Sequence, residues 1–269
     1  MMNLGFEITF LGGGGGRWES ITQNKGTGGF RISDGKLIAH VDPGPGTLVR
    51  MNQLNINPWK TDILFVSHCH PDHYTDAESI IEAMTKGMTK KQGLLIGNNS
   101  VLNGNKRFEK GISAYHQSRV FEKIVLKSGD FSKVQNWKIT ATSTKHNDPE
   151  TIGFKLETDF GTIGYTSDSE YINSLSSDFE SVDILIANVI RVKNQKVPGH
   201  MCSNDIIEVL NSMTKKPKLL VMYHMGMKIT EPDLEAKYIS KNTGISVEPA
   251  KIGLKVNLDN RYITLEYLL

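Results

Sequence analysis

Four potential metal ligands occur within six residues of this chain, in the run His68-Cys69-His70-Pro71-Asp72-His73. Three imidazoles and a carboxylate packed so densely have almost no structural use except to hold metal ions. The run follows the apolar segment 62–66, and side chains of an extended segment alternate, so His68 and His70 are expected on one side. The proline turn then brings Asp72 and His73 toward a neighbouring point. The pattern HxHxDH therefore predicts two adjacent metal positions.

Two metal ions held together need about six or seven protein ligands, so other parts of the chain must complete the site. Three residues qualify because each follows a predicted strand, where loops present functional groups on a rigid scaffold. They are His146, Asp168 and His224. A carboxylate can bridge two cations with its two oxygens, which an imidazole cannot do. Asp168 is therefore the predicted bridging ligand.

The composition indicates an enzyme-sized chain without a membrane segment. The 269 residues carry a formal net charge of +2, which excludes the protein-wide basic field of many nucleic-acid-binding proteins. No apolar stretch approaches the roughly 20 residues that span a bilayer, and the start of the chain does not resemble a signal peptide. Two cysteines are too few for a disulfide framework. We expect a cytoplasmic protein with no membrane partner.

The elements that must position these residues are mostly strands with interspersed helices. Apolar runs that end in Gly, Asp or Ser predict strands over residues 6–11, 29–32, 37–41, 63–66, 138–142, 152–157, 162–166, 184–187, 219–222, 252–258 and 262–267. Helical periodicity predicts helices over residues 77–84, 204–213 and 232–241, the first capped by Asp76 and the second by Ser203 or Asn204. This order predicts an α/β fold of two mixed sheets flanked by helices, in a single domain over residues 1–269.

These motifs, taken in order, resemble the metallo-β-lactamase superfamily and, within it, the ribonuclease Z-like phosphodiesterase branch. The resemblance covers nearly the whole chain. It is carried by the glycine-rich turn 10–16, the aspartate-glycine turn 41–47, HxHxDH, the segments 145–155 and 164–169, and Tyr223-His224.

The resemblance implies a four-layered αββα sandwich that binds two divalent metal ions. His68, His70 and His146 would hold one ion, Asp72, His73 and His224 the other, with Asp168 between them. Zinc is the expected metal, and the same ligands accept manganese, iron or nickel. A homodimer is implied in the same way. Asp42 would brace the metal loop by a hydrogen bond to a ligand.

Differences between this sequence and neighbouring branches of the superfamily disfavour several of their activities. Asp168 stands where classical zinc β-lactamases place a cysteine, and His70 where flavodiiron proteins carry a glutamate, so both activities are disfavoured. Transfer-RNA maturation enzymes have a long basic arm between the third histidine and the bridging aspartate. Here a short hairpin separates His146 from Asp168, and residues 187–191 replace a His-Glu-Ala-Thr segment. RNA is therefore not the favoured substrate.

The expected activity is hydrolysis of a small nucleotide-type phosphodiester, such as a cyclic nucleotide, a cyclic phosphate or a short oligonucleotide, by attack of a metal-bridging hydroxide. Asp72 would orient the hydroxide, and His200 would act as general acid or phosphate contact. The alternative is that His200 is an ordinary surface histidine at the start of a helix and has no catalytic role. Lactonase, thioesterase and RNA-processing nuclease activities remain open, as does a non-catalytic nucleotide-binding role.

Overall fold

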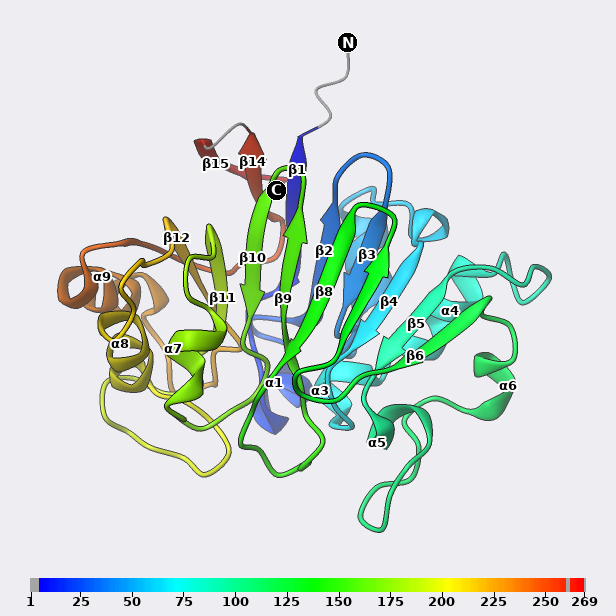
Figure 1. Cartoon of the computed structure of the whole chain (residues 1–269), viewed down its shortest axis with the longest axis horizontal. Coiled ribbons are helices and arrows are strands. Elements are labelled where there is room, and N and C mark those ends of the chain that lie inside the picture. Colours follow the sequence, from blue (N-terminus) through cyan, green and yellow to red (C-terminus); the bar gives the residue numbers. More distant parts are fainter. Residues whose placement is uncertain (1–4, 260–261, 269) are drawn as a thin grey trace. The chain divides into compact units, whose positions relative to one another are not determined.

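The computed structural model describes residues 5–259 and 262–268, and the chain forms two compact units, each with its own sheet and helices (Figure 1). Unit 1 consists of Met1–Gly12, Lys25–Leu126 and Lys251–Leu269. Unit 2 consists of Gly13–Asn24 and Lys127–Ala250. No helix within the described ranges is long and apolar enough to cross a membrane.

Unit 1 contains an eight-stranded mixed sheet in the order β15-β14-β1-β2-β3-β4-β5-β6. The strands β3 to β6 run parallel, and the other neighbours pair antiparallel. The bounds of its strands are β1 Phe6–Gly12, β2 Thr27–Ser33, β3 Ile38–Val41, β4 Ile63–Val66, β5 Leu94–Gly97, β6 Glu122–Val125, β14 Leu254–Asp259 and β15 Tyr262–Tyr267. Every residue of β4 is buried, as expected for a parallel strand covered on both faces.

The helices of unit 1 are short, and one of them shows the clearest amphipathic pattern. They are α2 Thr47–Gln53, the 3-10 turn η1 Pro58–Lys60, α3 Pro71–Tyr74, α4 Ala77–Met84, α5 Asn99–Leu102 and α6 Ala114–Gln117. In α4 the residues Ala77, Ile80, Ile81 and Met84 recur at helical spacing and join a core that also contains Leu64 of β4. This packing anchors α4 and holds the loop between it and β4.

Unit 2 contains a seven-stranded mixed sheet in the order β13-β12-β11-β10-β9-β8-β7. Its strands are β7 Phe131–Val134, β8 Trp137–Thr142, β9 Gly153–Thr158, β10 Gly161–Tyr165, β11 Ile184–Asn188, β12 Leu219–Tyr223 and β13 Ser246–Pro249, and its helices are α1 Arg17–Thr22, α7 Ser174–Asp178, α8 Ser203–Asn211 and α9 Pro232–Thr243. The strands β10 to β13 are parallel, so their carboxyl ends lie at one edge of the sheet. Phe179 and Ile206 belong to the core that packs on this sheet.

The predicted α/β fold of two mixed sheets flanked by helices is confirmed, and of the two predicted helix caps one has the right position and the other is wrong. Asp76 stands at the predicted N-cap position of α4, but its side chain makes no capping hydrogen bond there, because its carboxylate accepts hydrogen bonds from backbone N–H groups at the start of α2. The cap of α8 is Cys202, whose backbone N–H donates to Asp205 Oδ2 at 2.9 Å, rather than Ser203 or Asn204. The prediction of a single domain over residues 1–269 stays a prediction.

Candidate metal centre

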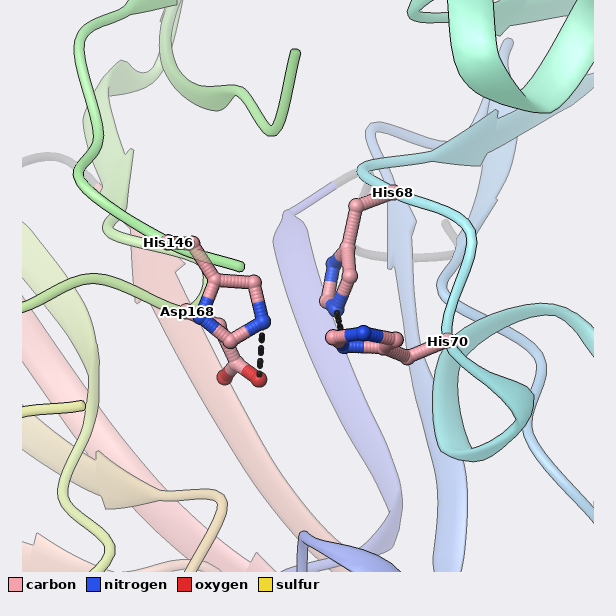
Figure 2. Close-up of side chains that lie close together, drawn as sticks. All are labelled: His68, His70, His146 and Asp168. Carbon is pink, nitrogen blue, oxygen red and sulfur yellow. Dashed lines mark hydrogen bonds and ion pairs between the residues drawn. The ribbon is translucent and has the colours of Figure 1, made fainter. Parts of the chain in front are cut away.

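In unit 1, the predicted ligands of the HxHxDH run lie on the loop that leaves the carboxyl end of β4 and on the short helix α3. His68 and His73 are buried, with 0% and 1% exposure. His68 Nε2 lies 3.0 Å from His70 Nδ1 (Figure 2), and the rings of His68 and His73 are 4.1 Å apart. His73 Nε2 lies 3.7 Å from Asp72 Oδ2. All four side chains that we predicted from this run are therefore close together.

Asp42 organises this half of the site from the end of β3. Its Oδ1 accepts the backbone N–H of Ser67 at 2.7 Å, and its Oδ2 accepts the Ser67 hydroxyl at 2.7 Å. The same Oδ2 lies 2.9 Å from His73 Nδ1. Asp42 has a φ of 49°, in the left-handed region that residues other than glycine seldom adopt. The predicted bracing role of Asp42 thus corresponds to an observed contact with His73.

The hydrogen bonds of Ser67 and Asp42 determine which nitrogen of His68 and of His73 carries the lone pair that a metal ligand needs. Ser67 has one hydroxyl hydrogen and donates it to Asp42, so His68 Nδ1, 3.0 Å away, must be the donor to Ser67 Oγ. His68 Nε2 then carries a lone pair. His73 Nδ1 donates to Asp42 in the same way, which leaves its Nε2 unprotonated. Carboxylates and other oxygen atoms commonly orient metal-binding histidines by such contacts.

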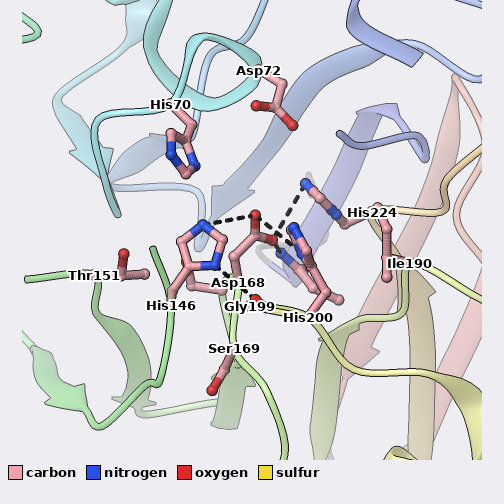
Figure 3. Close-up of polar contacts among 12 residues, drawn as sticks. His70, Asp72, His146, Thr151, Asp168, Ser169, Ile190, Gly199, His200 and His224 are labelled. Atoms are coloured by element: carbon pink, nitrogen blue, oxygen red, sulfur yellow. Dashed lines mark hydrogen bonds and ion pairs between the residues drawn. The ribbon is translucent and has the colours of Figure 1, made fainter. Parts of the chain in front are cut away.

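In unit 2, the predicted residues lie on loops at the carboxyl ends of strands (Figure 3). His146 follows β8, Asp168 follows β10, and His224 follows β12. His146 Nδ1 donates to the carbonyl of Gly199 at 2.7 Å, so its Nε2 carries the lone pair. That nitrogen lies 3.6 Å from Asp168 Oδ2.

Asp168 is surrounded by three imidazoles. His200 Nδ1 lies 3.6 Å from its Oδ2, and His224 Nε2 lies 3.3 Å from its Oδ1. These distances are long for direct hydrogen bonds. Two ligands bound to one zinc ion at about 2.0–2.1 Å with tetrahedral geometry are about 3.3–3.4 Å apart, so the separations suit atoms that share a cation. Asp168, His200 and His224 together form a group that could hold a metal ion.

His200 therefore lies beside the predicted ligands Asp168 and His224 and is mostly buried, unlike an ordinary surface histidine. Its side chain is 18% exposed, and it stacks on His224 with an interplanar angle of 20°. It is not the cap of α8, which is Cys202. Whether His200 binds a metal, a phosphate or a proton stays a prediction. Two histidines that we assigned no role, His40 and His116, lie in none of the groups of described residues that could hold a metal ion.

Several residues that hold the predicted ligands in place were not predicted from the sequence. Their roles depend on contacts between segments that are far apart in the sequence. Asn188, the last residue of β11, donates its Nδ2 hydrogen to Asp168 Oδ1 at 2.8 Å. Glu170 accepts the backbone N–H of Gly199 at 2.9 Å. The Lys145 ammonium and that N–H hold the pKa of Glu170 below its ordinary value. This carboxylate therefore fixes the loop whose carbonyl orients His146.

Two glycines give the imidazoles of unit 2 the room they occupy. A Cβ on Gly15 would lie 2.1 Å from the His224 ring, so no side chain fits there. Gly199 has a φ of 82°, and a Cβ on it would lie 2.9 Å from His146 Nδ1. The glycine-rich turn therefore has a steric function beside the predicted ligands, which the residue pattern alone did not indicate.

Known proteins resemble this chain in sequence. A family described as the Beta-lactamase superfamily domain matches residues 39–225. The chain is 58% identical to protein MJ1374 of Methanocaldococcus jannaschii, over 94% of this chain and 96% of that protein. It is 27% identical to ribonuclease Z of Thermococcus sibiricus over 59% of this chain, an alignment that spans only 46% of that enzyme.

Solved structures share the fold at low sequence identity. The metallo-β-lactamase fold protein YhfI from Bacillus subtilis is 20% identical and has a TM-score of 0.77, covering 93% of this chain and 98% of that one. A diphosphatase of the PhnP family is 15% identical with a TM-score of 0.68, covering 93% of this chain and 96% of that one.

Proposed function

Because the chain belongs to the beta-lactamase superfamily, we propose that it is a dinuclear metal-dependent hydrolase that cleaves a small phosphodiester of nucleotide type. The predicted αββα metallo-β-lactamase fold and the resemblance to the ribonuclease Z-like branch are both confirmed. Substrates of this class include cyclic nucleotides, cyclic phosphates and short oligonucleotides.

The observation that carries the proposal is the environment of Asp168. Its Oδ2 faces His146 and His200, while its Oδ1 faces His224, at 3.3 to 3.6 Å. A carboxylate whose two oxygens face different imidazoles suits a ligand that bridges two cations. A site for one structural ion would need only one of these oxygens.

The proposed centre uses all seven ligands predicted from the sequence, which agrees with the roughly six or seven that two ions require. The matched domain, residues 39–225, includes all seven predicted ligands and His200. The ligand set is His68, His70, Asp72, His73, His146, Asp168 and His224. All donors are nitrogen or oxygen, which suits zinc and also manganese, iron or nickel.

Two divalent ions at such a centre would acidify a water molecule and neutralise charge on a phosphoryl oxygen. Residues of the chain would position the metal ligands, the attacking water and the substrate. Asp42 and Ser67 hold His68 and His73 with their Nε2 atoms unprotonated. Asp72 would orient the attacking water through its carboxylate. His200 would donate a proton to the leaving oxygen or contact the phosphate.

Two further observations favour a phosphodiester substrate. Relatives that carry names for phosphoester chemistry, a ribonuclease Z and a diphosphatase, favour a phosphodiester over a lactone or thioester. The ribonuclease Z similarity makes RNA processing the second candidate. A short connection, β9 and β10 with their turn, joins the loop of His146 to that of Asp168, which favours the smaller substrate.

The proposal is tested by metal analysis and a substrate panel. The purified protein should contain two tightly bound divalent ions per chain, and Asp168→Asn should retain fewer. It should hydrolyse bis-p-nitrophenyl phosphate and at least one cyclic mononucleotide, short oligonucleotide or cyclic phosphate. His116→Ala, a histidine outside both groups, is the matched control and should keep metal and activity.

Other outcomes decide between the alternatives. Turnover of a lactone or thioester with inactive diesters would replace the proposed substrate class. Cleavage of a precursor transfer RNA with inactive small diesters would favour the nuclease. Two bound ions without turnover of any of these substrates would favour a non-catalytic nucleotide-binding role, and one ion or none would contradict the dinuclear centre.

A further inference from the structure

Unit 1 contains a cavity of about 260 Å³ that involves none of the predicted metal ligands. The residues that line it include the polar Arg31, Lys60, Asn55 and Asn57 and the apolar Ile38 and Ile56. It lies at the amino ends of β3 and β4, whereas the HxHxDH loop leaves the carboxyl end of β4. Four residues of β4 separate the two ends, or about 13 Å at 3.3 Å per residue.

Arg31 is the unusual residue of this cavity. It is only 5% exposed. Its Nη1 donates to Thr61 Oγ1 at 2.9 Å, and Thr61 donates its own hydrogen to the Pro58 carbonyl, so the partner of the guanidinium is a neutral hydroxyl. Among residues 5–259 and 262–268, no carboxylate lies within ion-pair distance of Arg31. Buried arginines are normally paired with an anion.

The pKa of Arg31 indicates that neighbouring carboxylates do not fully offset the burial of its positive charge. Burial lowers the pKa of Arg31 to about 10, although Asp62 and Glu7 act in the opposite direction. Glu7 also lines the cavity, but its carboxylate is already bound by Lys255 Nζ at 3.0 Å and by the Thr9 hydroxyl at 2.9 Å. The guanidinium therefore has hydrogen-bond donors to offer that no described carboxylate takes.

The other polar groups of the wall are also suited to an anion. Lys60 adds a second positive charge. The side-chain oxygen of Asn57 accepts the backbone N–H of Trp59 at 2.9 Å, which leaves its NH₂ group to donate. A guanidinium, an ammonium and an amide around one cavity match the planar or tetrahedral oxygens of carboxylate and phosphate groups.

We propose that this cavity is a binding site for a small oxyanion, a carboxylate or phosphate group on a small molecule, held by Arg31 and Lys60. The two isoleucines would contact the apolar part of that molecule. The site is independent of the proposed hydrolase activity, since it shares no residue with the predicted metal centre.

The test measures thermal unfolding of the purified, metal-containing protein with inorganic phosphate or with acetate, at constant ionic strength. Variants are Arg31→Met, Lys60→Gln and, as control, Lys36→Gln, an exposed lysine of unit 1 outside the cavity. Phosphate at about 100 times its dissociation constant should raise the wild-type Tm by about 5 °C. The rise should disappear in Arg31→Met, weaken at least about tenfold in apparent affinity in Lys60→Gln, and persist in Lys36→Gln.

Each result is decisive. Phosphate bound at the metal ligands would raise Tm equally in all four proteins, and that outcome overturns the proposal. So does a lack of any rise in wild type with both anions. A rise with acetate as well assigns carboxylates to the site, and a rise with phosphate alone assigns phosphate. If Arg31→Met does not fold, the exposed Lys60→Gln against Lys36→Gln gives the same comparison.

Discussion

His40 should make the protein less stable in mild acid. It is fully buried in β3, and its Nε2 lies 3.0 Å from the Gly28 carbonyl, to which it donates. Burial lowers the pKa of His40 to about 3, and the nearby Arg31 charge acts in the same direction. In the unfolded chain the pKa of a histidine is about 6.5. Between these values the unfolded state binds a proton that the folded state does not.

The sign and size of the effect follow from this difference. As the pH falls below about 6.5, protonation stabilises only the unfolded chain, so the free energy of unfolding decreases by about 1.4 kcal/mol per pH unit. At pH 5 the loss amounts to about 2 kcal/mol from this one residue. Above pH 7 His40 contributes almost no pH dependence.

The assay is urea unfolding of wild type and His40→Gln at pH 8 and pH 5. The variant loses stability at both values through poorer packing, but its stability should fall about 2 kcal/mol less between them. Thr47→Val is the matched control, because Thr47 Oγ1 contacts the same Gly28 carbonyl at 3.1 Å and does not titrate. The ligand histidines contribute the same pH dependence of the free energy of unfolding to all three proteins. Equal falls in wild type and His40→Gln would refute the reasoning.

Three further predictions concern the metal centre. Asp42→Asn should weaken metal binding by about 10–100-fold, measured by competition with a chelator, because His73 loses its carboxylate partner; unchanged affinity would contradict the role of Asp42. Gly199→Ala should destabilise the protein by about 1–2 kcal/mol in urea, since its φ is 82° and the added Cβ crowds His146; a neutral result would disprove the steric argument. His200→Ala should slow turnover of a diester with a poor leaving group more than that of bis-p-nitrophenyl phosphate, and equal slowing would exclude a proton donor.

Local patterns were sufficient to predict many of the elements. The bounds of β4 and α4 agree with those predicted from the residues, because a buried apolar strand and an amphipathic helix each carry a strong sequence pattern. The bounds of β15 also agree, although this strand is largely exposed. The predicted ligands lie at strand ends for the same reason. The pattern indicates where a strand stops, and the loop follows there.

Contacts between distant segments were not predictable. The carboxylate of Asp76 binds the start of α2, which begins 29 residues earlier at Thr47, so Asp76 stands at the predicted N-cap position of α4 without a capping hydrogen bond from its side chain. The strands β5, β6, β7 and β13 were not predicted, and β6 and β7 are largely exposed and lack an apolar period. Nothing near Gly199 in the sequence indicates that its carbonyl binds His146, 53 residues away.

The pairing of β1 with β14 has a consequence for how the chain folds during synthesis. These strands lie at opposite ends of the sequence yet are neighbours in one sheet, with Phe6 opposite Leu258 (Figure 1). At about 5–20 residues per second, the ribosome needs roughly 12–50 seconds to make the intervening chain. During that time β1, with its buried Phe6, Ile8 and Phe10, has β2 on one side and an unpaired edge on the other. The nascent protein therefore exposes an apolar strand edge until its last strands emerge, and this edge is where a chaperone would act or aggregation would begin.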